Sequence, residues 1–587
     1  MTDTSVLKEA PPLAALTWRD GSLLRDGKPY RMLSGSIHYF RVHPEQWEDR
    51  LRRLAAMGAN TVDTYVAWNF HEEVEGVRRF DGWRDLERFI RLAGDVGLEV
   101  LLRPSPYICA EWSNGGLPAW LTGRVRAVRT SDPAFLAAVD AWYDELLPRM
   151  APLQAVHGGP IVAVQVENEY GSFGSDRAYL EHQRDAIRAH GIVELLTTAD
   201  GIMADMHHHG SVAGALPTFT FGTGVATAQR LAAPGTALVC SELWGGWFDH
   251  WGERHHVRSR ESMMGTVDEL LTAGGSLSMY MAHGGTNFGL WNGANWDGVL
   301  QPTVTSYDSD APIGEDGTLG PKFHALRAAF APFHQRALPA VPAAPRFQPE
   351  QTVPLTAEVA LVDAVRSIPA AHVHAMPLSF EDLGVSDGIV VYESTTFIHE
   401  GAVLTIDGLH DRAGVFVDGE RIATLARDGQ LSVSIPGGGV AVITIVVESL
   451  GRINYGPLIG ERKGILQGVR LGNRYVHGWT HRVLPLDGWQ PSGVAGTDGV
   501  ASAIIEVAEP ADAWLAFPGG AKGMVWLNGF LLGRYWAVGP QVTLYAPAPL
   551  WRAGRNELRV LDVDRLGDAI EVRQVPEFGE TEEFIGS

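Results

Sequence analysis

The chain has 587 residues, too many for a single hydrophobic core, so we expect several domains. A hydrophobic fraction of 45% and a charged fraction of 20% are typical of soluble globular proteins, and the sequence has no uninterrupted apolar run of membrane-spanning length. Its 47 basic and 69 acidic residues give a net charge of -22, which would repel a phosphate backbone. We therefore expect neither a nucleic-acid partner nor a membrane.

The cysteine content and the N-terminal sequence bear on location. Cys109 and Cys240 are too few for a disulfide framework, and there is no CxxC pair. Residues 1–16 contain an early acid and two prolines, where a signal peptide would have a basic region followed by an apolar core. We expect a cytoplasmic protein with a loosely ordered N-terminus.

Residues 30–330 alternate short β-branched apolar runs with helix-length amphipathic stretches, such as 44–58 and 83–97. This alternation is typical of βαβ units around a parallel sheet. Eight such units predict a (β/α)8 barrel over residues 1–335, with a doubly wound sheet as the alternative. The eight predicted strands are Met32–Tyr39, Thr61–Trp68, Glu99–Pro106, Ile161–Glu169, Glu194–Ala199, Thr218–Gly222, Ala237–Glu242 and Ser276–Met281.

A proline-rich stretch, residues 336–354, predicts an extended linker, because proline neither continues a helix nor pairs in a central strand. Beyond it, short strands separated by Gly, Asp and Asn turns predict two β-sandwich domains of the jelly-roll or galactose-binding type, at 355–488 and 489–587. A weak repeat supports this division, since Val415–Gly419 and Val525–Gly529 both run into hairpin turns.

Acidic residues stand at the ends of several predicted barrel strands, where barrel enzymes carry their active sites. They are Glu111, Glu167, Glu169, Glu242 and Asp308. Hydrolysis of a glycosidic bond needs two carboxyl groups on opposite sides of the anomeric carbon. Glu169 ends the fourth predicted strand and Glu242 the seventh, on different sides of the barrel mouth. Such a pair acts without a metal, and we expect no cofactor.

At these residues the chain closely resembles the β-galactosidases of glycoside hydrolase family 35, of the bacterial type. The signature stretch is Gly158–Tyr170, GGPIVAVQVENEY. Other matching stretches are SGSIHYFRV (34–42), TYVAWNFHE (64–72), RPSPYICAEWSNGGLPAWL (103–121), WGGWFDHWG (244–252), HGGTNFG (283–289), GRINYG (451–456) and KGI (463–465). The resemblance covers most of the chain.

The resemblance implies a retaining exo-β-galactosidase that removes terminal galactose from a β-galactoside oligosaccharide. It makes Glu169 the general acid/base and Glu242 the nucleophile, with carboxyl groups about 5 to 5.5 Å apart. Asn168 matches the residue that hydrogen-bonds the 2-hydroxyl group of the sugar. The other substrate-binding residues that it implies are Tyr65, Cys109, Ala110, Glu111, Trp244 and Tyr307.

The effect of three residues on the predicted site is not decided by the sequence. Ser309 stands where the family usually has a sugar-contacting tyrosine, so we expect Tyr307 or Trp291 to compensate or the pocket to be wider. Ala282 replaces a usual phenylalanine, which would also enlarge the site. Strand alternation places Glu167 on the same side as Glu169, where it either joins the chemistry or holds its neighbours in place.

Two other functions stay open: an exo-glycosidase for another β-linked sugar, such as glucosamine, and a carbohydrate-binding protein without activity. Three consecutive histidines, His207 to His209, cannot all face one metal ion in a regular element, so we expect a solvated loop there. We expect the β-domains to wall the barrel mouth. The sequence leaves open whether the chain forms homo-oligomers.

Overall fold

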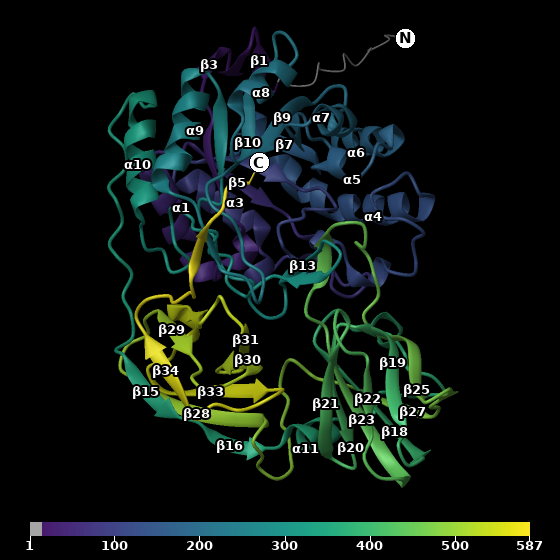
Figure 1. The fold of residues 1–587 in the computed structure, drawn as a ribbon. Helices are drawn as coiled ribbons and strands as arrows, with labels where there is room; N and C mark the ends of the chain where they lie inside the picture. The colour runs from purple at the N-terminus through teal and green to yellow at the C-terminus, as the bar shows by residue number, and fades with distance from the viewer. Residues whose placement is uncertain (1–13, 587) are drawn as a thin grey trace, which may run out of the picture.

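The computed structural model describes residues 14–586 as a barrel with two β-sandwich domains beneath it, side by side (Figure 1). The N-terminal residues 1–13, where we expect loose order, lie outside the described residues. Within residues 14–586, no helix is both long enough and apolar enough to cross a membrane.

Eight parallel strands close the barrel, and each corresponds to one of the eight predicted strands. The doubly wound alternative is therefore wrong, because that sheet stays open. In barrel order the strands are β4 (Leu33–Ser36), β5 (Thr61–Tyr65), β6 (Glu99–Arg103), β7 (Ile161–Asn168), β8 (Leu195–Gly201), β9 (Leu216–Phe221), β10 (Val239–Trp244) and β12 (Ser276–Tyr280).

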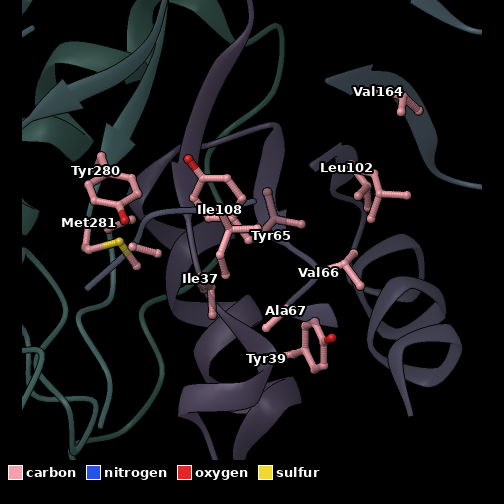
Figure 2. Packing of buried hydrophobic residues seen from close by; sticks show 14 of the residues in the cluster. Ile37, Tyr39, Tyr65, Val66, Ala67, Leu102, Ile108, Val164, Tyr280 and Met281 are labelled. Carbon is pink, nitrogen blue, oxygen red and sulfur yellow. The ribbon is translucent and has the colours of Figure 1, made fainter. Parts of the chain in front are cut away.

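Helices cover the outside of the barrel, including the two predicted ones. Strands β5 and β7 are buried along their whole length, as expected for a parallel sheet covered on both faces. The hydrophobic core of the barrel contains side chains from several strands and from the segments that follow them. Among these side chains are Ile37, Val66, Leu102 and Val164 (Figure 2). The helices are α1 (Trp47–Met57), α2 (Trp68–His71), α3 (Leu86–Asp95), α4 (Pro133–Met150), α5 (Tyr170–Phe173), α6 (Arg177–Ala189), α7 (Ala204–Gly210), α8 (Val225–Leu231), α9 (Arg260–Thr272) and α10 (Pro321–Phe330).

A small antiparallel sheet closes the amino-terminal end of the barrel. Its strands are β1 (Leu16–Arg19), β2 (Ser22–Arg25) and β3 (Lys28–Tyr30). Leu16 and Leu23 pack against Leu101, Val162 and Val239, which lie at or near the starts of barrel strands. The carboxyl ends of the strands are thus left as the mouth at which side chains can meet a ligand.

The first β-domain is a sandwich of a six-stranded and a four-stranded sheet around an apolar core. The larger sheet contains β17 (His372–His374), β27 (Trp479–Val483), β18 (Ile389–Ile398), β23 (Gly439–Glu448), β20 (Arg412–Val417) and β21 (Glu420–Ala426). The smaller sheet contains β22 (Ser432–Ser434), β19 (Val403–His410), β25 (Gly464–Leu471) and β26 (Arg474–Tyr475).

The second β-domain is also a sandwich, of five and four strands. Its larger sheet contains β16 (Thr356–Val359), β28 (Gly499–Val507), β33 (Gly554–Asp562), β30 (Lys522–Leu527) and β31 (Phe530–Trp536). Its smaller sheet contains β15 (Gln351–Pro354), β34 (Ala569–Arg573), β29 (Ala513–Ala516) and β32 (Thr543–Ala546). Jelly-roll connectivity stays a prediction for both domains.

The weak repeat corresponds to equivalent hairpins in the two sandwiches. Asp418 and Gly419 join β20 to β21, and Asn528 and Gly529 join β30 to β31. All four residues have positive φ angles, between 50° and 90°. Two successive residues of this kind suit the tight turns that match the twist of paired strands.

The boundaries of the linker and of the first β-domain need a correction. Strand β15, which we place in the linker, pairs with β34, and β16, which we place in the first β-domain, pairs with β28. Both therefore belong to the second β-domain. Each is an edge strand of its sheet, a position in which the proline at the end of β15 is tolerated. Helix α11 (Leu361–Arg366) follows β16.

Two strand pairings connect the barrel to the β-rich part of the chain. Strand β13 (Gly293–Trp296), which also pairs with β14 (Leu300–Pro302), pairs with β24 (Arg452–Tyr455) of the first β-domain. Strand β11 (His255–Val257) pairs with β35 (Thr581–Glu583), which follows the second β-domain. A buried ion-pair cluster joins the two β-domains to each other: Glu448 of the first contacts Lys522 at 2.5 Å and Arg534 at 3.2 Å, both in the second.

Candidate active site

Glu169 and Glu242 line one cavity of about 350 Å³ at the carboxyl ends of the barrel strands. Glu242 lies in β10, and Glu169 directly follows β7. All nine predicted site residues line this cavity: Tyr65, Cys109, Ala110, Glu111, Asn168, Glu169, Glu242, Trp244 and Tyr307. Further lining comes from Ile108, Gly246, Trp247, Phe248, Tyr280, Asn295, Ser309, Tyr455, Phe584 and Gly586.

The carboxyl group of Glu242 is surrounded by hydrogen-bond donors from the ends of β5, β6 and β10. Arg103 Nη2, at the end of β6, donates to Glu242 Oε1 over 2.5 Å, and Tyr65 Oη, at the end of β5, donates over 2.6 Å. Trp244 Nε1 donates to Oε2 over 3.3 Å. Burial lowers the pKa of Arg103, but Tyr65, Asp63 and Glu242 outweigh it and raise that pKa overall. The guanidinium therefore supplies a permanent positive charge beside Glu242.

The same two groups contact Asn168 beside Glu242. Tyr65 Oη is 2.7 Å from Asn168 Oδ1, and Arg103 Nη2 donates to that oxygen over 2.8 Å. Because its oxygen is engaged by these groups, the amide is oriented rather than free to rotate. This is the arrangement that a residue needs if it is to bind one specific hydroxyl group of a sugar.

The environment of Glu169 is different. Its backbone is left-handed, with φ 47° and ψ 39°, so that the chain turns out of β7 at this residue. Thr220, in β9, donates from its hydroxyl group to Glu169 Oε1 over 2.9 Å. Burial, together with the negative charge of Glu242, raises the pKa of Glu169 from 4.5 to about 7. One carboxyl group of the pair is thus suited to carry a proton near neutral pH.

Glu111 forms a second polar point in the cavity wall. Tyr307 Oη donates to Glu111 Oε2 over 2.5 Å, and Asn454 Nδ2, from the first β-domain, donates to Oε1 over 3.3 Å. Burial raises the pKa of Glu111. Cys109, Ala110 and Glu111 have φ angles of 55°, 56° and 48°, and such runs of left-handed residues are typical of ligand sites.

Two carboxyl groups with contrasting environments, facing one cavity, are the arrangement expected of a glycosidase. Residues 22–333 match the family described as "Glycosyl hydrolases family 35". The chain is 40% identical over 582 residues to a protein named "Beta-galactosidase" from Bos taurus, an alignment that covers 91% of this chain and 87% of that protein. The chain belongs to glycosyl hydrolases family 35.

Other relatives and the β-domains agree with this membership. The chain is 39% identical over 591 residues to "Beta-galactosidase" from Homo sapiens, covering 92% of this chain and 86% of that protein. It is 36% identical over 609 residues to "Beta-galactosidase 17" from Arabidopsis thaliana, covering 93% and 87%. Residues 377–487 match "Beta-galactosidase, first all-beta domain", and residues 501–556 match "Beta-galactosidase, galactose-binding domain".

In this family 35 glycoside hydrolase, Glu167 does not share the cavity with Glu169. Arg129 binds both carboxylate oxygens of Glu167 at 3.0 Å, and Tyr179 donates to it over 3.0 Å. The expectation from strand alternation is wrong because Glu169 lies beyond the strand, in a left-handed turn. Asn168 and Glu169 line the cavity instead, and Glu167 holds neighbouring groups in place, as one of its two readings proposed.

Of the two residues expected to compensate for the missing tyrosine at Ser309, one lines the cavity and the other does not. Ser309 and Tyr307 both line the cavity, whereas Trp291 stacks on Trp112 with ring centroids 5.2 Å apart and does not. Ala282 is buried, packs near Gly35 and does not line the cavity either, so it does not widen it directly.

Two further expectations concern residues outside the cavity. His207 to His209 form part of helix α7, not a loop. Asp308 does not line the cavity; its Oδ2 atom lies 4.0 Å from His255 Nε2, and burial raises its pKa to about 6. Among residues 14–586, no three His, Cys, Asp or Glu side chains are grouped as metal ligands.

Sequence reasoning missed several residues of the site. Arg103 lies within the predicted strand Glu99–Pro106 and ends β6 in the structure, and a search for acidic residues at strand ends does not find it. Tyr280 ends β12, and Tyr455 lies in the GRINYG stretch, so both could have been found. Phe584 and Gly586 could not, because their place in the cavity depends on how the chain folds back after the second β-domain.

Proposed function

We propose that the protein is a retaining exo-β-galactosidase that removes terminal β-linked galactose from oligosaccharides. The observation that carries the proposal is the contrast between the two carboxyl groups of the cavity. Glu242 faces the guanidinium of Arg103, and Glu169, bonded to a neutral hydroxyl group, has a pKa raised to about 7. This contrast suits a nucleophile and a general acid, respectively.

In the first step, Glu242 attacks the anomeric carbon and forms an ester bond to galactose. Glu169 gives its proton to the glycosidic oxygen as the bond from that oxygen to the anomeric carbon breaks, and the aglycone leaves as an alcohol. Asn168 is positioned by Tyr65 and Arg103 to bind the 2-hydroxyl group, a contact that strengthens as charge develops on the sugar ring.

In the second step, Glu169, now ionised, takes a proton from water. The resulting hydroxide bonds to the anomeric carbon from the face that the aglycone left, and the ester bond to Glu242 breaks. Two displacements give galactose in the β configuration and return both carboxyl groups to their starting states.

We propose that Glu111 selects galactose. Its carboxyl group is buried and held by Tyr307 and Asn454, so it is available to accept hydrogen bonds from sugar hydroxyl groups in one geometry. An epimer that does not reach it would leave a buried polar group unpaired, which costs about 1 to 3 kcal/mol.

We also propose that the β-domains restrict the enzyme to chain ends. Tyr455 of the first β-domain and Phe584, which follows the second, both line the cavity that contains the two glutamates. A cavity with walls from three parts of the chain admits a terminal residue more readily than the middle of a polysaccharide.

Initial rates on nitrophenyl glycosides test the proposal. The panel contains the β-galactoside, α-galactoside, β-glucoside, β-fucoside and β-glucosaminide, each with and without a chelator. We expect a chelator-insensitive preference for the β-galactoside, and proton NMR should show β-galactose as the first product. Preference for the β-glucosaminide would favour the alternative sugar, and no turnover of any substrate would contradict the proposal.

We propose a cytoplasmic location, which the two free, buried thiols of Cys109 and Cys240 fit. Cell fractionation with an antibody to the protein tests it, and recovery outside the cytoplasmic fraction would contradict it.

A further inference from the structure

The chain segment that follows the second β-domain returns to the barrel mouth. After β34 it leaves the sandwich and rises toward the barrel, ending near β10 in the view of Figure 1. Strand β35 pairs in parallel with β11, with His255 opposite Thr581 and Val257 opposite Glu583. His255 N donates to Glu580 O over 2.9 Å, and Phe584 N donates to Val257 O over 2.8 Å.

Side chains hold the segment in this place as well. The ring of Phe578 stacks on that of His255, with centroids 4.2 Å apart. His255 is fixed in turn by Asp249, whose Oδ2 lies 2.7 Å from His255 Nδ1. Arg254 and Glu580 form an exposed ion pair at 3.1 Å. Both backbone pairing and side-chain contacts therefore hold the segment against the barrel.

Beyond β35, Phe584 and Gly586 reach the cavity that contains the two glutamates. The Phe584 ring lies 5.0 Å from that of Trp247. A Cβ atom added to Gly586 would lie 2.6 Å from ring atoms of Trp244 and of Trp247, so the backbone lies directly against both indoles. Trp244 also donates a hydrogen bond to Glu242, so the segment is separated from that carboxyl group only by the Trp244 side chain.

The segment also lies near the side of the site that holds Glu169. Gly222 directly follows β9, two residues after Thr220, which donates to Glu169. A Cβ atom on Gly222 would lie 2.3 Å from Gly586 O. Residues 584–586 therefore contact both strand ends that present or support the two carboxyl groups.

We infer that Phe584 and Gly586 determine which aglycones the enzyme accepts. The inference rests on the proposed function. The group that leaves is bonded to the oxygen that Glu169 protonates, so it lies toward the opening of the cavity and not at the galactose site. Phe584, which is half-buried and lines the cavity, offers an apolar aromatic face of the kind that packs against sugar rings and aryl groups. Gly586, by its lack of a side chain, sets the positions of Trp244 and Trp247.

Comparison of two substrates with different leaving groups tests this inference. 4-Nitrophenyl β-galactoside has an aglycone large enough to contact Phe584, whereas the fluoride of β-galactosyl fluoride has none. We expect Phe584→Ala to lower kcat/KM for the nitrophenyl substrate about tenfold and to leave kcat/KM for the fluoride unchanged. Phe584→Tyr keeps the aromatic ring, so its kcat/KM for the nitrophenyl substrate should be close to that of the wild type.

Two further variants sharpen the test. Gly586→Ala should displace the indoles and change the ratio of the two kcat/KM values by a similar factor. Ile585→Ala is the matched control, because Ile585 is 41% exposed and does not line the cavity, and its ratio should equal that of the wild type.

The outcomes separate the roles. If Phe584→Ala lowered kcat/KM equally for both substrates, or for neither, the inference would be overturned. A purely structural role would change kcat/KM for both substrates by the same factor. Activity of the wild type on neither substrate would overturn the proposed function and this inference with it.

Discussion

Arg103 and Glu242 form a buried ion pair in which Nη2 and Oε1 are 2.5 Å apart and the side chains are 0% and 7% exposed. Arg103 also binds Asn168 at 2.8 Å and Gln165 at 2.8 Å, and lies 3.5 Å from Asp63. One guanidinium therefore positions the two residues that we propose to contact the sugar at its anomeric carbon and its 2-hydroxyl group.

Replacement of Arg103 should harm both activity and stability. Arg103→Met leaves Asp63 and Glu242 buried without their cation, which typically costs about 3 to 5 kcal/mol. We expect kcat/KM to fall at least a hundredfold and the free energy of unfolding in urea to fall by about that amount. Arg91→Met, on an exposed side chain of α3, is the control; equal effects of the two changes would contradict the assignment.

The roles of the two carboxyl groups are distinguishable by rescue with azide. In Glu242→Ala, azide should take the place of the missing nucleophile and give α-galactosyl azide. In Glu169→Ala, with a nitrophenyl substrate that needs no acid, azide should attack the galactosyl enzyme and give β-galactosyl azide. Proton NMR of the products identifies the anomer. The same anomer from both variants would show that the roles are wrongly assigned.

Activity should depend on the protonation of Glu169. Its pKa is raised to about 7 by burial and by the charge of Glu242, and the first step needs the protonated form. We therefore expect kcat/KM to fall as pH rises through about 7. A profile that stays flat to pH 9 would contradict this.

Stability should depend on the same group. Because the folded-state pKa of Glu169 lies above the ordinary value of 4.5, its contribution to stability is full below about pH 4.5 and is lost as pH rises through 7. Glu169→Gln is neutral at every pH, so it should be more stable than the wild type at pH 8.5, by a margin that shrinks toward pH 5. Urea unfolding at several pH values measures the margin; a constant margin would refute the explanation.

The first β-domain should support the activity through Asn454, which positions Glu111. This residue donates from Nδ2 to Glu111 over 3.3 Å and to Asn295 over 3.0 Å. Asn454→Ala removes a donor from a buried carboxyl group, a loss of about 1 to 3 kcal/mol, so kcat/KM should fall about tenfold or more. Tyr475→Ala, an exposed change in the same domain, should have no effect. Normal kinetics of Asn454→Ala would show that the contact is dispensable.

The sequence predicts the barrel well because short apolar runs alternate with helix-length amphipathic stretches eight times. It also predicts which residues share the cavity, since the carboxyl ends of parallel strands meet at one mouth. Glu167 shows where the reasoning fails: alternation holds only within a strand, and a single left-handed residue at Glu169 ends it. The pairings of β15, β16 and β35 were not predictable, because they join segments far apart in the chain.

The position of β16 affects the order in which the domains are able to fold. Strand β16 pairs with β28, and the whole first β-domain lies between these two strands in the sequence. The second β-domain is thus begun before the first is made and completed after it. During synthesis, β15 and β16 stay unpaired until the whole first β-domain has been made. A ribosome that stalls within the first β-domain therefore leaves two unpaired strands exposed to other chains.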